Sequence, residues 1–541
     1  MFTSYEFIIF MLAVIAVYYL VPKRFQWMLL LVANFLFYYS AGPSYPIFIL
    51  VTSFTVYLAG WAMGRKDEQL NTYLAKIKSG EMEQPSKEEK KQPSKEEKKA
   101  YKKWINQKKK VIMLLCLILN IGILTVVKYT NFAVENINVL LDMTGKQTLS
   151  YVDLILPMGI SFYTFQAVGY LLDVYWNKCE PQNNFFKFTL FVSFFPQLMQ
   201  GPISRYGDLS KTLYTKHRFD WKQVRFGLER VLWGYFKKLV IADRIGVAVA
   251  ALTEDPEYYT GAFVALTMLF YAVQLYADFT GGIDITIGIA QSLGIHLEEN
   301  FIRPYFSKNI AEYWRRWHIT MGTWFRDYLF YPLSISRPVK AITKFCKKHF
   351  GMAVARRMPV YIVTILLWLG TGIWHGAAWF YVTWGLANGV IILLSEEFTP
   401  LYKKFHQKFP KLTASWGYRA FQVIRTFCLM CCLRLVDTYR DVTVTGKQFI
   451  HLFTQFRLQD VTKQELLDLG LAQADYIVLL VGVIILFLVS LAGRDGSVRE
   501  KISKQSYIVR YAIYVILFFA VLLLGSYGVG FDSQQFIYNQ F

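Results

Sequence analysis

Residues 359–395 read PVYIVTILLWLGTGIWHGAAWFYVTWGLANGVIILLS and contain no Asp, Glu, Lys or Arg. Basic segments flank this run at 334–358 and 403–411, and loops rich in Lys and Arg stay on the cytoplasmic side of a membrane. The run must therefore enter the membrane and return. Its first arm, 359–374, reaches roughly 24 Å at about 1.5 Å per residue, less than the ~30 Å hydrocarbon core. The turn at Trp374, His375 and Gly376 is predicted to lie within the membrane or near its outer boundary.

The composition predicts the same environment for the rest of the chain. The 541 residues are 54% hydrophobic and 17% aromatic, and only 18% are charged. Apolar runs of near-spanning length recur, which predicts an all-α polytopic membrane protein with roughly 10–13 helices that cross or enter the bilayer. These runs lie at 5–22, 25–41, 45–63, 110–128, 150–176, 185–200, 224–252, 259–293, 359–396, 418–436, 475–492 and 507–526.

The positive charge indicates an orientation rather than a nucleic-acid partner. The net charge is +21, but the basic residues fall in short segments between apolar runs and form no basic domain, so no nucleic-acid binding is expected. The loop 64–110, the segment 334–358 and the loop 494–504 are predicted to be cytoplasmic. Counting spans from them places the N-terminus and the tail at 528–541 outside. The run at 7–21 has no small-residue cleavage site after it, so we expect a retained first span.

The 64–110 loop contains a tandem repeat, QPSKEEKK at 84–91 and again at 92–99. So charged a stretch cannot bury enough apolar surface to fold, which predicts a solvated, partly helical linker. Binding to anionic headgroups or a cytosolic partner is the alternative. Cys428, Cys431 and Cys432 lie within an apolar run, where free Cys usually behaves as a small buried hydrophobe, and Cys116 and Cys179 show no CxxC spacing. No His/Cys/Glu cluster with metal-ligand spacing occurs, so neither a disulfide framework nor a metal site is predicted.

His375 is a candidate for chemistry because an imidazole at membrane depth is costly and usually functional. Gly370, Gly372 and Gly376 allow close backbone approach and a broken helix, which is tolerated there only against protein or a watery cavity. A neutral imidazole in such a cavity can take the proton of a hydroxyl that attacks an acyl carbonyl. An interhelical hydrogen bond made by a buried His is the alternative, and the residues alone do not separate the two.

A second histidine lies in YWRRWHITMGTWFRD, residues 313–327. On a helix, His318 would share a face with Trp314 and Gly322, while Arg315 and Arg316 would point elsewhere, suited to phosphate or carboxylate groups. An interfacial amphipathic helix anchored by Trp and Arg is the alternative, and without further information it is favoured.

Two polar islands interrupt other apolar runs. Asp278 and Asp284, within 276–284, place two carboxylates at membrane depth, where a functional role or a paired bundle contact is expected. PQLMQGPISR at 196–205 has the Pro and Gly punctuation of an irregular, cavity-lining segment.

Longer motifs carry a family resemblance. They are FFPQLMQGPISR at 194–205, the stretch 274–333 that contains YADFTGGID and WRRWHI, GIWHGAAWFYVTWGLANG at 372–389 and the closing GFDSQQFIY at 530–538. In this order and at this separation they resemble the membrane-bound O-acyltransferase superfamily, in particular its alginate O-acetyltransferase branch. The resemblance spans nearly the whole chain.

The resemblance implies a bundle of broken, tilted and re-entrant helices around a central tunnel. It implies His375 at the acyl-transfer point and His318 lining the tunnel or assisting proton transfer. Further tunnel candidates are Trp314, Arg315, Arg316, Trp317, Asp278, Trp374 and Asn388. The division expected is N-terminal helices at 1–63, the charged loop at 64–110, a catalytic core at 111–436, and C-terminal helices with the tail at 437–541.

For function, the resemblance implies an O-acetyltransferase in a bacterial cell membrane. The acetyl group would come from a cytosolic thioester, acetyl-coenzyme A as donor substrate, with no permanently bound cofactor. It would cross the bilayer to an extracytoplasmic acceptor protein with an SGNH-hydrolase-like domain, and finally to a polysaccharide. D-alanyl transfer to teichoic acid is a near alternative; a proton-coupled transporter or a decayed scaffold are alternatives of other classes.

The chain departs from the branch pattern in four places. Gly282 stands where an aromatic residue is usual, and 334–337 replaces an expected double-glycine turn. CLRLVDTYRD at 432–441, with Arg434 and Asp437, replaces an apolar-aromatic segment that ends in Phe-Arg, and the insertion 64–110 is atypical. These departures leave the chemistry intact but put the polymer and the protein partner in doubt.

Overall fold

A computed structural model of the protein describes residues 2–79, 94–527 and 536. Within these ranges the regular secondary structure is helical, apart from one isolated bridge between Phe301 and Trp317, and this confirms the predicted all-α class. The chain divides into two compact units, one of residues 17–199 and 203–218 and the other of residues 1–16, 200–202 and 219–541. The four-segment division expected from the sequence stays a prediction.

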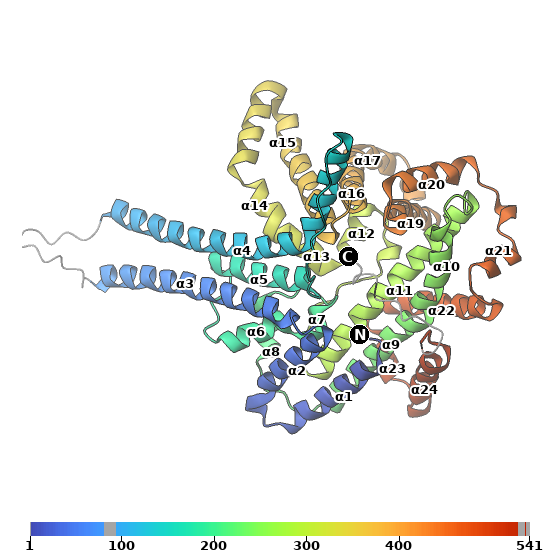
Figure 1. Ribbon diagram of the computed structural model, residues 1–541, viewed down its shortest axis with the longest axis horizontal. Helices are drawn as coiled ribbons and strands as arrows, with labels where there is room; N and C mark the ends of the chain where they lie inside the picture. Colours follow the sequence, from blue (N-terminus) through green and yellow to red (C-terminus); the bar gives the residue numbers. More distant parts are fainter. Residues whose placement is uncertain (1, 80–93, 528–535, 537–541) are drawn as a thin grey trace, which may run out of the picture. The chain divides into compact units, whose positions relative to one another are not determined.

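The first of these units is built on two long helices, α3 (Tyr45–Ser79) and α4 (Lys95–Met143), which pack side by side (Figure 1). Ser94 and Glu97 close a capping box at the start of α4, so each satisfies a backbone N–H that the first turn leaves unpaired. The described parts of the expected linker are therefore helical: α3 extends to residue 79, and α4 begins at residue 95. The first repeat, 84–91, lies outside the described residues. The smaller helices are α2 (Gln26–Ala41), α5 (Ile160–Tyr175), α6 (Phe185–Ser193), α7 (Phe195–Leu198) and α8 (Tyr206–Leu213).

The second unit centres on α11 (Ala262–Ser292), against which α9 (Trp221–Tyr235) packs along its length (Figure 1). Glycines bring the two backbones together. A Cβ on Gly234 would lie 2.6 Å from the carbonyl oxygen of Gly281, and one on Gly227 would lie 2.5 Å from that of Gly288. Small residues at helix interfaces permit this close packing in membranes. Between α9 and α10 (Asp243–Glu254) the chain makes a π-helical turn, Phe236–Ala242.

The predicted membrane hairpin is present in this unit. Helix α15 (Arg337–His375) ends at the predicted turn, and α16 (Trp379–Glu397) returns along it (Figure 1). A Cβ on Gly372 would lie 2.4 Å from the carbonyl oxygen of Tyr381, so the absence of a side chain lets the arms meet near the turn. Gly351 interrupts α15 with a positive φ of 81°, within the basic segment 334–358.

The remaining helices of this unit are mostly short. They are α12 (Ile310–Arg316), α13 (Ile319–Phe325), α14 (Tyr331–Ser334), α17 (Thr399–Lys408), α18 (Pro410–Ala414), α19 (Trp416–Tyr439), α20 (Val442–Thr454), α21 (Lys463–Asp468), α22 (Gln473–Ala492), α23 (Val498–Ser503) and α24 (Tyr507–Leu524). Of the tail 528–541, expected to be extracytoplasmic, only Phe536 lies among the described residues.

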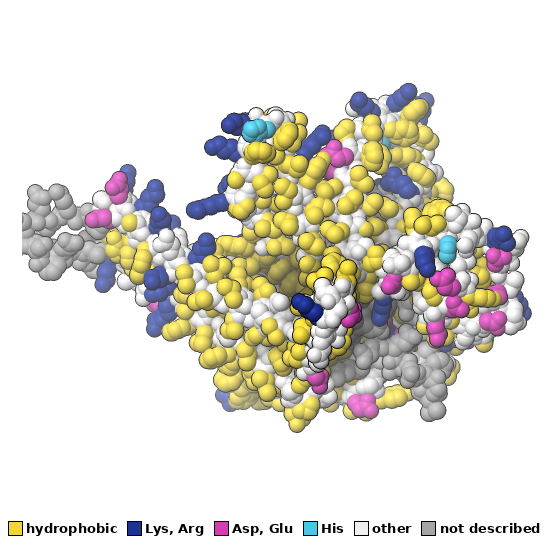
Figure 2. Space-filling model, turned by 45° about the horizontal axis from the view of Figure 1, so that its top comes forward, with side chains coloured by type: hydrophobic (Ala, Val, Ile, Leu, Met, Phe, Trp, Pro, Cys, Tyr) yellow, Lys and Arg dark blue, Asp and Glu magenta, His cyan; other side chains and the backbone are white. Residues whose placement is uncertain are grey.

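Six helices of the described chain are long and apolar enough to cross a membrane: α3, α4, α11, α15, α22 and α24. A shorter apolar helix, α1 (Tyr5–Leu20), precedes them. Other predicted runs fall on shorter elements; the run 224–252, for example, is divided among α9, the π-helical turn and α10. Figure 2 shows hydrophobic side chains over most of the displayed face and basic side chains near the free ends of α3 and α4.

The contact between α9 and α11 leads to a stability prediction. Gly234→Val would press a branched side chain against the carbonyl oxygen of Gly281, and overpacking of this kind costs about 1–3 kcal/mol. We expect a lower apparent melting temperature for the detergent-solubilised variant. Gly122→Val on α4 is the matched control, since a Cβ there meets no atom within 4 Å. Equal melting temperatures for the two variants would contradict the packing role of Gly234.

Candidate active site at the membrane hairpin

His375 is held at the turn of the hairpin by close aromatic packing. Its ring lies 4.8 Å from that of Trp384, edge to face, and 6.3 Å from that of Tyr381, nearly parallel. A Cβ on Gly376 would lie 2.0 Å from the Tyr381 ring, so this ring can approach only because residue 376 is glycine. The side chain of His375 is buried, at 7% exposure. Two aromatic residues of α16 therefore fix the imidazole that ends α15.

A small cavity lies beside His375. Its volume is about 10 Å³, roughly the room that one water molecule needs. Its walls come from α11, α12, α13, the hairpin and α19, and they are mostly aromatic. The lining residues are Leu275, Trp314, Trp317, Met321, His375, Tyr381, Trp384, Arg434 and Asp437. The structure thus brings three predicted residues, His375, Trp314 and Trp317, to one space.

His318 does not lie within a helix, so its predicted helical face with Trp314 and Gly322 is wrong. It separates α12 from α13 in the left-handed conformation, with φ 47° and ψ 54°. The backbone around it pairs with residues 300–302 instead: the amide of Ile302 donates to Arg316 O and that of Ile319 donates to Asn300 O. This pairing competes with helical hydrogen bonds and breaks the helix at residue 318.

The surroundings of His318 also exclude the interfacial anchor. The side chain is 0% exposed, and the Phe279 ring lies 5.0 Å from its ring. Nδ1 of His318 is 3.2 Å from Oδ1 of Asn300, an oxygen that also accepts hydrogen bonds from the backbone and hydroxyl of Thr320. Because an amide oxygen only accepts, this contact assigns the proton to Nδ1 and leaves Nε2 as the basic nitrogen.

Burial, and then the nearby Arg434 guanidinium, lower the pKa of His318 to about 3. The imidazole is therefore neutral at physiological pH, as a proton acceptor must be. Trp374 connects the two histidines: its ring lies 6.4 Å from that of His318 and 5.2 Å from that of His375. Trp374 is thus placed between the two predicted catalytic residues.

The other predicted tunnel residues lie apart from the cavity. Arg315 is exposed, and Arg316 pairs with Glu312 at 2.5 Å, one turn earlier on α12. Asn388 is fully buried and donates to the carbonyl oxygen of Trp384 at 2.8 Å. It therefore contacts a residue of the cavity wall without lining the cavity. Asp278 pairs with Lys238 at 2.7 Å. The central tunnel itself stays a prediction.

Two cavity residues, Arg434 and Asp437, were noted in the sequence only as departures from the family pattern. Arg434 Nη1 donates to Asp437 Oδ2 at 2.6 Å, and the guanidinium carbon lies over the rings of three tryptophans. These are Trp314 at 5.7 Å, Trp317 at 5.3 Å and Trp384 at 5.1 Å. The signal available in the sequence was an Arg and an Asp three residues apart at the end of an apolar run.

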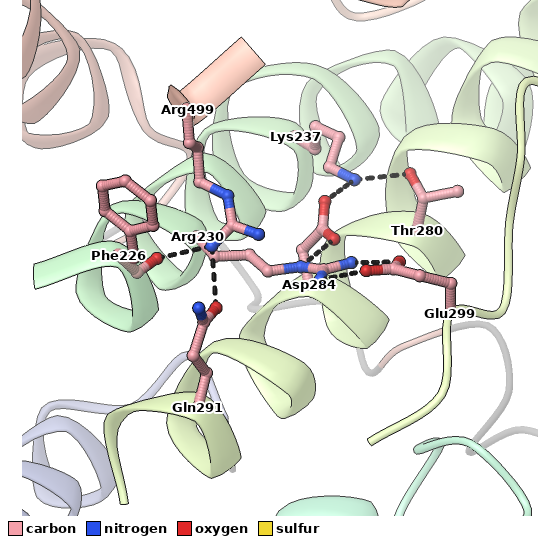
Figure 3. Close-up of polar contacts among 8 residues, drawn as sticks. All are labelled: Phe226, Arg230, Lys237, Thr280, Asp284, Gln291, Glu299 and Arg499. Carbon is pink, nitrogen blue, oxygen red and sulfur yellow. Dashed lines mark hydrogen bonds and ion pairs between the residues drawn. The ribbon is translucent and has the colours of Figure 1, made fainter. Parts of the chain in front are cut away.

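An ion cluster, buried except at the half-exposed Glu299, supports the loop that orients His318 (Figure 3). Arg230 on α9 donates from Nε to Asp284 at 2.7 Å, and from Nη1 and Nη2 to the two oxygens of Glu299, each at 2.6 Å. Lys237 donates to the second oxygen of Asp284 at 2.6 Å and to Thr280 at 2.8 Å. Glu299 directly precedes Asn300, so the cluster fixes the residue that holds His318.

Arg499 of α23 lies beside this cluster. It donates to Phe226 O at 2.7 Å and to Gln291 at 2.8 Å (Figure 3).

Both predicted intramembrane carboxylates, Asp278 and Asp284, make paired bundle contacts. Among the described residues no group of three or more His, Cys, Asp or Glu side chains is placed to hold a metal ion.

The departure at Gly282 has a packing reason. A Cβ on Gly282 would lie 1.6 Å from Nε2 of Gln200 and 3.1 Å from the ring of Phe536. A side chain at this position would therefore displace both the PQLMQGPISR segment and the aromatic residue of the tail. These three motif segments, far apart in the sequence, meet at this glycine.

Comparison with known proteins shows a similarity that covers slightly less than half of the chain. Residues 181–436, which include His318, His375 and Arg434, match the membrane-bound O-acyltransferase family. Together with this match, the six apolar helices of the described chain confirm the predicted multi-pass membrane protein.

Relatives within the O-acyltransferase family act on different polymers, by their names. A probable alginate O-acetylase AlgI from Pseudomonas syringae pv. tomato is 31% identical over 366 residues, which are 66% of this chain and 64% of that protein. The peptidoglycan O-acetyltransferase of Helicobacter pylori is 32% identical over 57% of this chain and 60% of its own length. The teichoic acid D-alanyltransferase of Bacillus subtilis is 28% identical over 55% and 71%. This chain spans less than two thirds of the length of the first two relatives.

The ion cluster yields a prediction about the architecture around His318. Arg230→Leu would leave Glu299 without its bidentate partner and Asp284 with Lys237 alone. Because the Glu299 side chain is 53% exposed and Asp284 keeps one partner, the cost should fall below the about 3–5 kcal/mol of a fully buried broken pair. We expect a lower apparent melting temperature. Arg457→Leu, at an exposed position of the same unit, should leave that temperature unchanged. A stable Arg230→Leu protein would show that the cluster does not hold the fold.

Proposed function

We propose that this protein is a membrane-bound O-acetyltransferase of a bacterial cell membrane. It takes an acetyl group from a cytosolic thioester, acetyl-coenzyme A, and passes it across the bilayer for O-acetylation of an extracellular or cell-wall polysaccharide. The observation that carries the proposal is the buried His375 at the turn of a membrane hairpin, beside a cavity shared with Trp314, Trp384 and Arg434. The O-acetylase names of two relatives support the acetyl group.

In this mechanism His375 is the general base. The acceptor hydroxyl loses its proton to His375 as its oxygen attacks the thioester carbonyl carbon, and the imidazolium then protonates the departing thiolate. His318, neutral and with Nε2 as its basic nitrogen, lies one aromatic ring away and assists proton transfer. Among the described residues neither Ser nor Cys lines the cavity, which supports direct transfer to the acceptor without an acyl-enzyme.

The partners proposed are those on the two sides of the membrane. The basic segment 334–358 and the other inner loops suit the phosphates of coenzyme A. This assignment places both termini outside. An extracytoplasmic protein with an SGNH-hydrolase-like domain is the immediate acceptor, and a polysaccharide is the final one.

D-alanyl transfer is the second candidate, because two relatives are named teichoic acid D-alanyltransferases. The acetyl group remains the first candidate because the two O-acetylating relatives are 31% and 32% identical to this chain, against 28% and 24% for the D-alanyltransferases. Competition between acetyl-coenzyme A and a D-alanyl thioester carrier in membranes separates the two. If the polymer became labelled only when the D-alanyl carrier was the labelled donor, the acetyl assignment would be rejected.

His375→Ala tests the proposed function. Loss of a general base lowers the rate about 10²–10⁴-fold, so acetyl transfer from labelled acetyl-coenzyme A in membranes should fall by about that factor. The level of the protein in the membrane, measured by blotting, should stay unchanged. His296→Ala is the matched control, since the side chain of that histidine is 74% exposed and lies outside the basic segments. Full activity of His375→Ala would remove this residue from the mechanism.

His318→Ala tests the assisting role separately. Because His318 is buried against Asn300 and Trp374 rather than in the cavity wall, its loss should slow transfer without releasing the donor. We expect donor binding, measured with labelled acetyl-coenzyme A, within about threefold of wild type and transfer reduced about 10²-fold. Loss of binding together with transfer would instead assign His318 to the donor site.

A further inference from the structure

The cavity beside His375 contains hydrogen-bond donors that the fold does not use. Nε of Arg434 and Nε1 of Trp314 and of Trp384 have no hydrogen-bond acceptor among the described residues, although each atom is buried. All three residues line the cavity. A buried donor without an acceptor costs about 1–3 kcal/mol, so a site with three of them is built for something that accepts hydrogen bonds.

The groups that hold Arg434 in place do not accept a hydrogen bond from its Nε. Nη1 of Arg434 donates to Asp437 at 2.6 Å. The centres of the Trp317 and Trp384 rings lie 5.3 Å and 5.1 Å from the guanidinium carbon. The salt bridge and the aromatic faces hold the guanidinium plane, while Nε keeps its N–H. The donors are thus fixed in advance of any ligand, as electrostatic stabilisation of a transition state requires.

The chemistry of the occupant follows from these donors. A cation and two indole N–H groups suit an oxygen that carries negative charge, whereas the aromatic walls and the small volume exclude a large or strongly hydrated anion. A thioester carbonyl oxygen meets both conditions because it is small and gains charge only during reaction. His375 lies on the same cavity and contacts the same Trp384 ring, at 4.8 Å.

We propose that Arg434, together with the indole N–H groups of Trp384 and Trp314, forms the oxyanion-binding site of the acyl transfer. This inference rests on the proposed function and assigns Arg434 as a catalytic residue of the same site. Asp437 is a positioning residue, since it orients the guanidinium.

The step balances as follows. The acceptor oxygen forms a bond to the thioester carbonyl carbon, its proton moves to His375, and the carbonyl π pair moves onto the oxygen bound by Arg434 and the indoles. The tetrahedral intermediate then collapses: that pair re-forms the carbonyl, the carbon–sulfur bond breaks, and the thiolate takes the proton from His375. The products are the acyl ester and the free thiol, and no oxidant or metal is consumed.

The test compares two substitutions that remove donors to different extents. Arg434→Gln removes the cation and its Nε–H, whereas Trp384→Phe keeps an aromatic ring and removes one N–H. Loss of a donor to an oxyanion lowers kcat about 10²–10³-fold, so we expect about 10²-fold for Trp384→Phe and about 10³-fold for Arg434→Gln, which also loses the cation. KM for acetyl-coenzyme A should stay within about threefold, because the interaction forms in the transition state.

Matched controls and a chemical readout separate catalysis from folding. Arg419→Gln and Trp416→Phe change exposed residues at the start of the same α19 and should keep wild-type kcat. Guanidinium ion added to Arg434→Ala should restore part of kcat, which a purely structural role would not allow. If Arg434→Ala does not accumulate, Trp384→Phe decides, since it leaves Arg434 in place.

The outcomes distinguish the two proposals. Transfer by wild type, with kcat of Arg434→Gln and Trp384→Phe within threefold of it, would overturn the oxyanion site and leave the proposed function standing. A fall in kcat that guanidinium does not relieve, with a matching fall in melting temperature, would also overturn it. No acetyl transfer by the wild-type protein in membranes that contain donor and acceptor would overturn both.

Discussion

Charge buried in an apolar bundle is the constraint on which the rest of this structure depends. An unpaired Lys or Asp at membrane depth is expensive, so each must meet an opposite charge held in place by the backbone. The unit that contains both histidines does this between α9, the π-helical turn and α11. Arg230 and Lys237 share Asp284, and Lys238 bridges Asp243 and Asp278, each at 2.7 Å. The close glycine contacts between α9 and α11 bring these partners within reach.

The paired charges also support the candidate active site, because Glu299 and Asn300 are consecutive residues. Arg230 binds Glu299, and the next residue, Asn300, accepts three hydrogen bonds that orient His318 and the start of α13. The strained φ of His318 is therefore supported by a charge cluster that does not touch the cavity. In the cavity wall itself, Arg434 and Asp437 form a second pair, packed against tryptophans. The candidate site thus depends on two separate sets of paired charges.

Part of this arrangement could be predicted because its causes are local in the sequence. The hairpin of α15 and α16 follows from the length of an uncharged run and from the basic segments on both sides. The family and the position of His375 follow from short motifs. The conformation of His318 could not be predicted, because Asn300 and Phe301, well before it in the chain, pair with its backbone and end the helix. Arg434 was missed as a site residue for the same reason: its tryptophans come from α12, residue 317 and α16.

The π-helical turn at Phe236–Ala242 has a mechanical consequence. Because this turn is wider than an α-helical one, two consecutive lysines, Lys237 and Lys238, both reach α11, where their acids Asp284 and Asp278 are six positions apart. Sliding this turn along α11 by a single residue would separate both pairs at once. The two ion pairs therefore fix the register between the π-helical turn and α11. The break in α15 at Gly351 lies outside this interface.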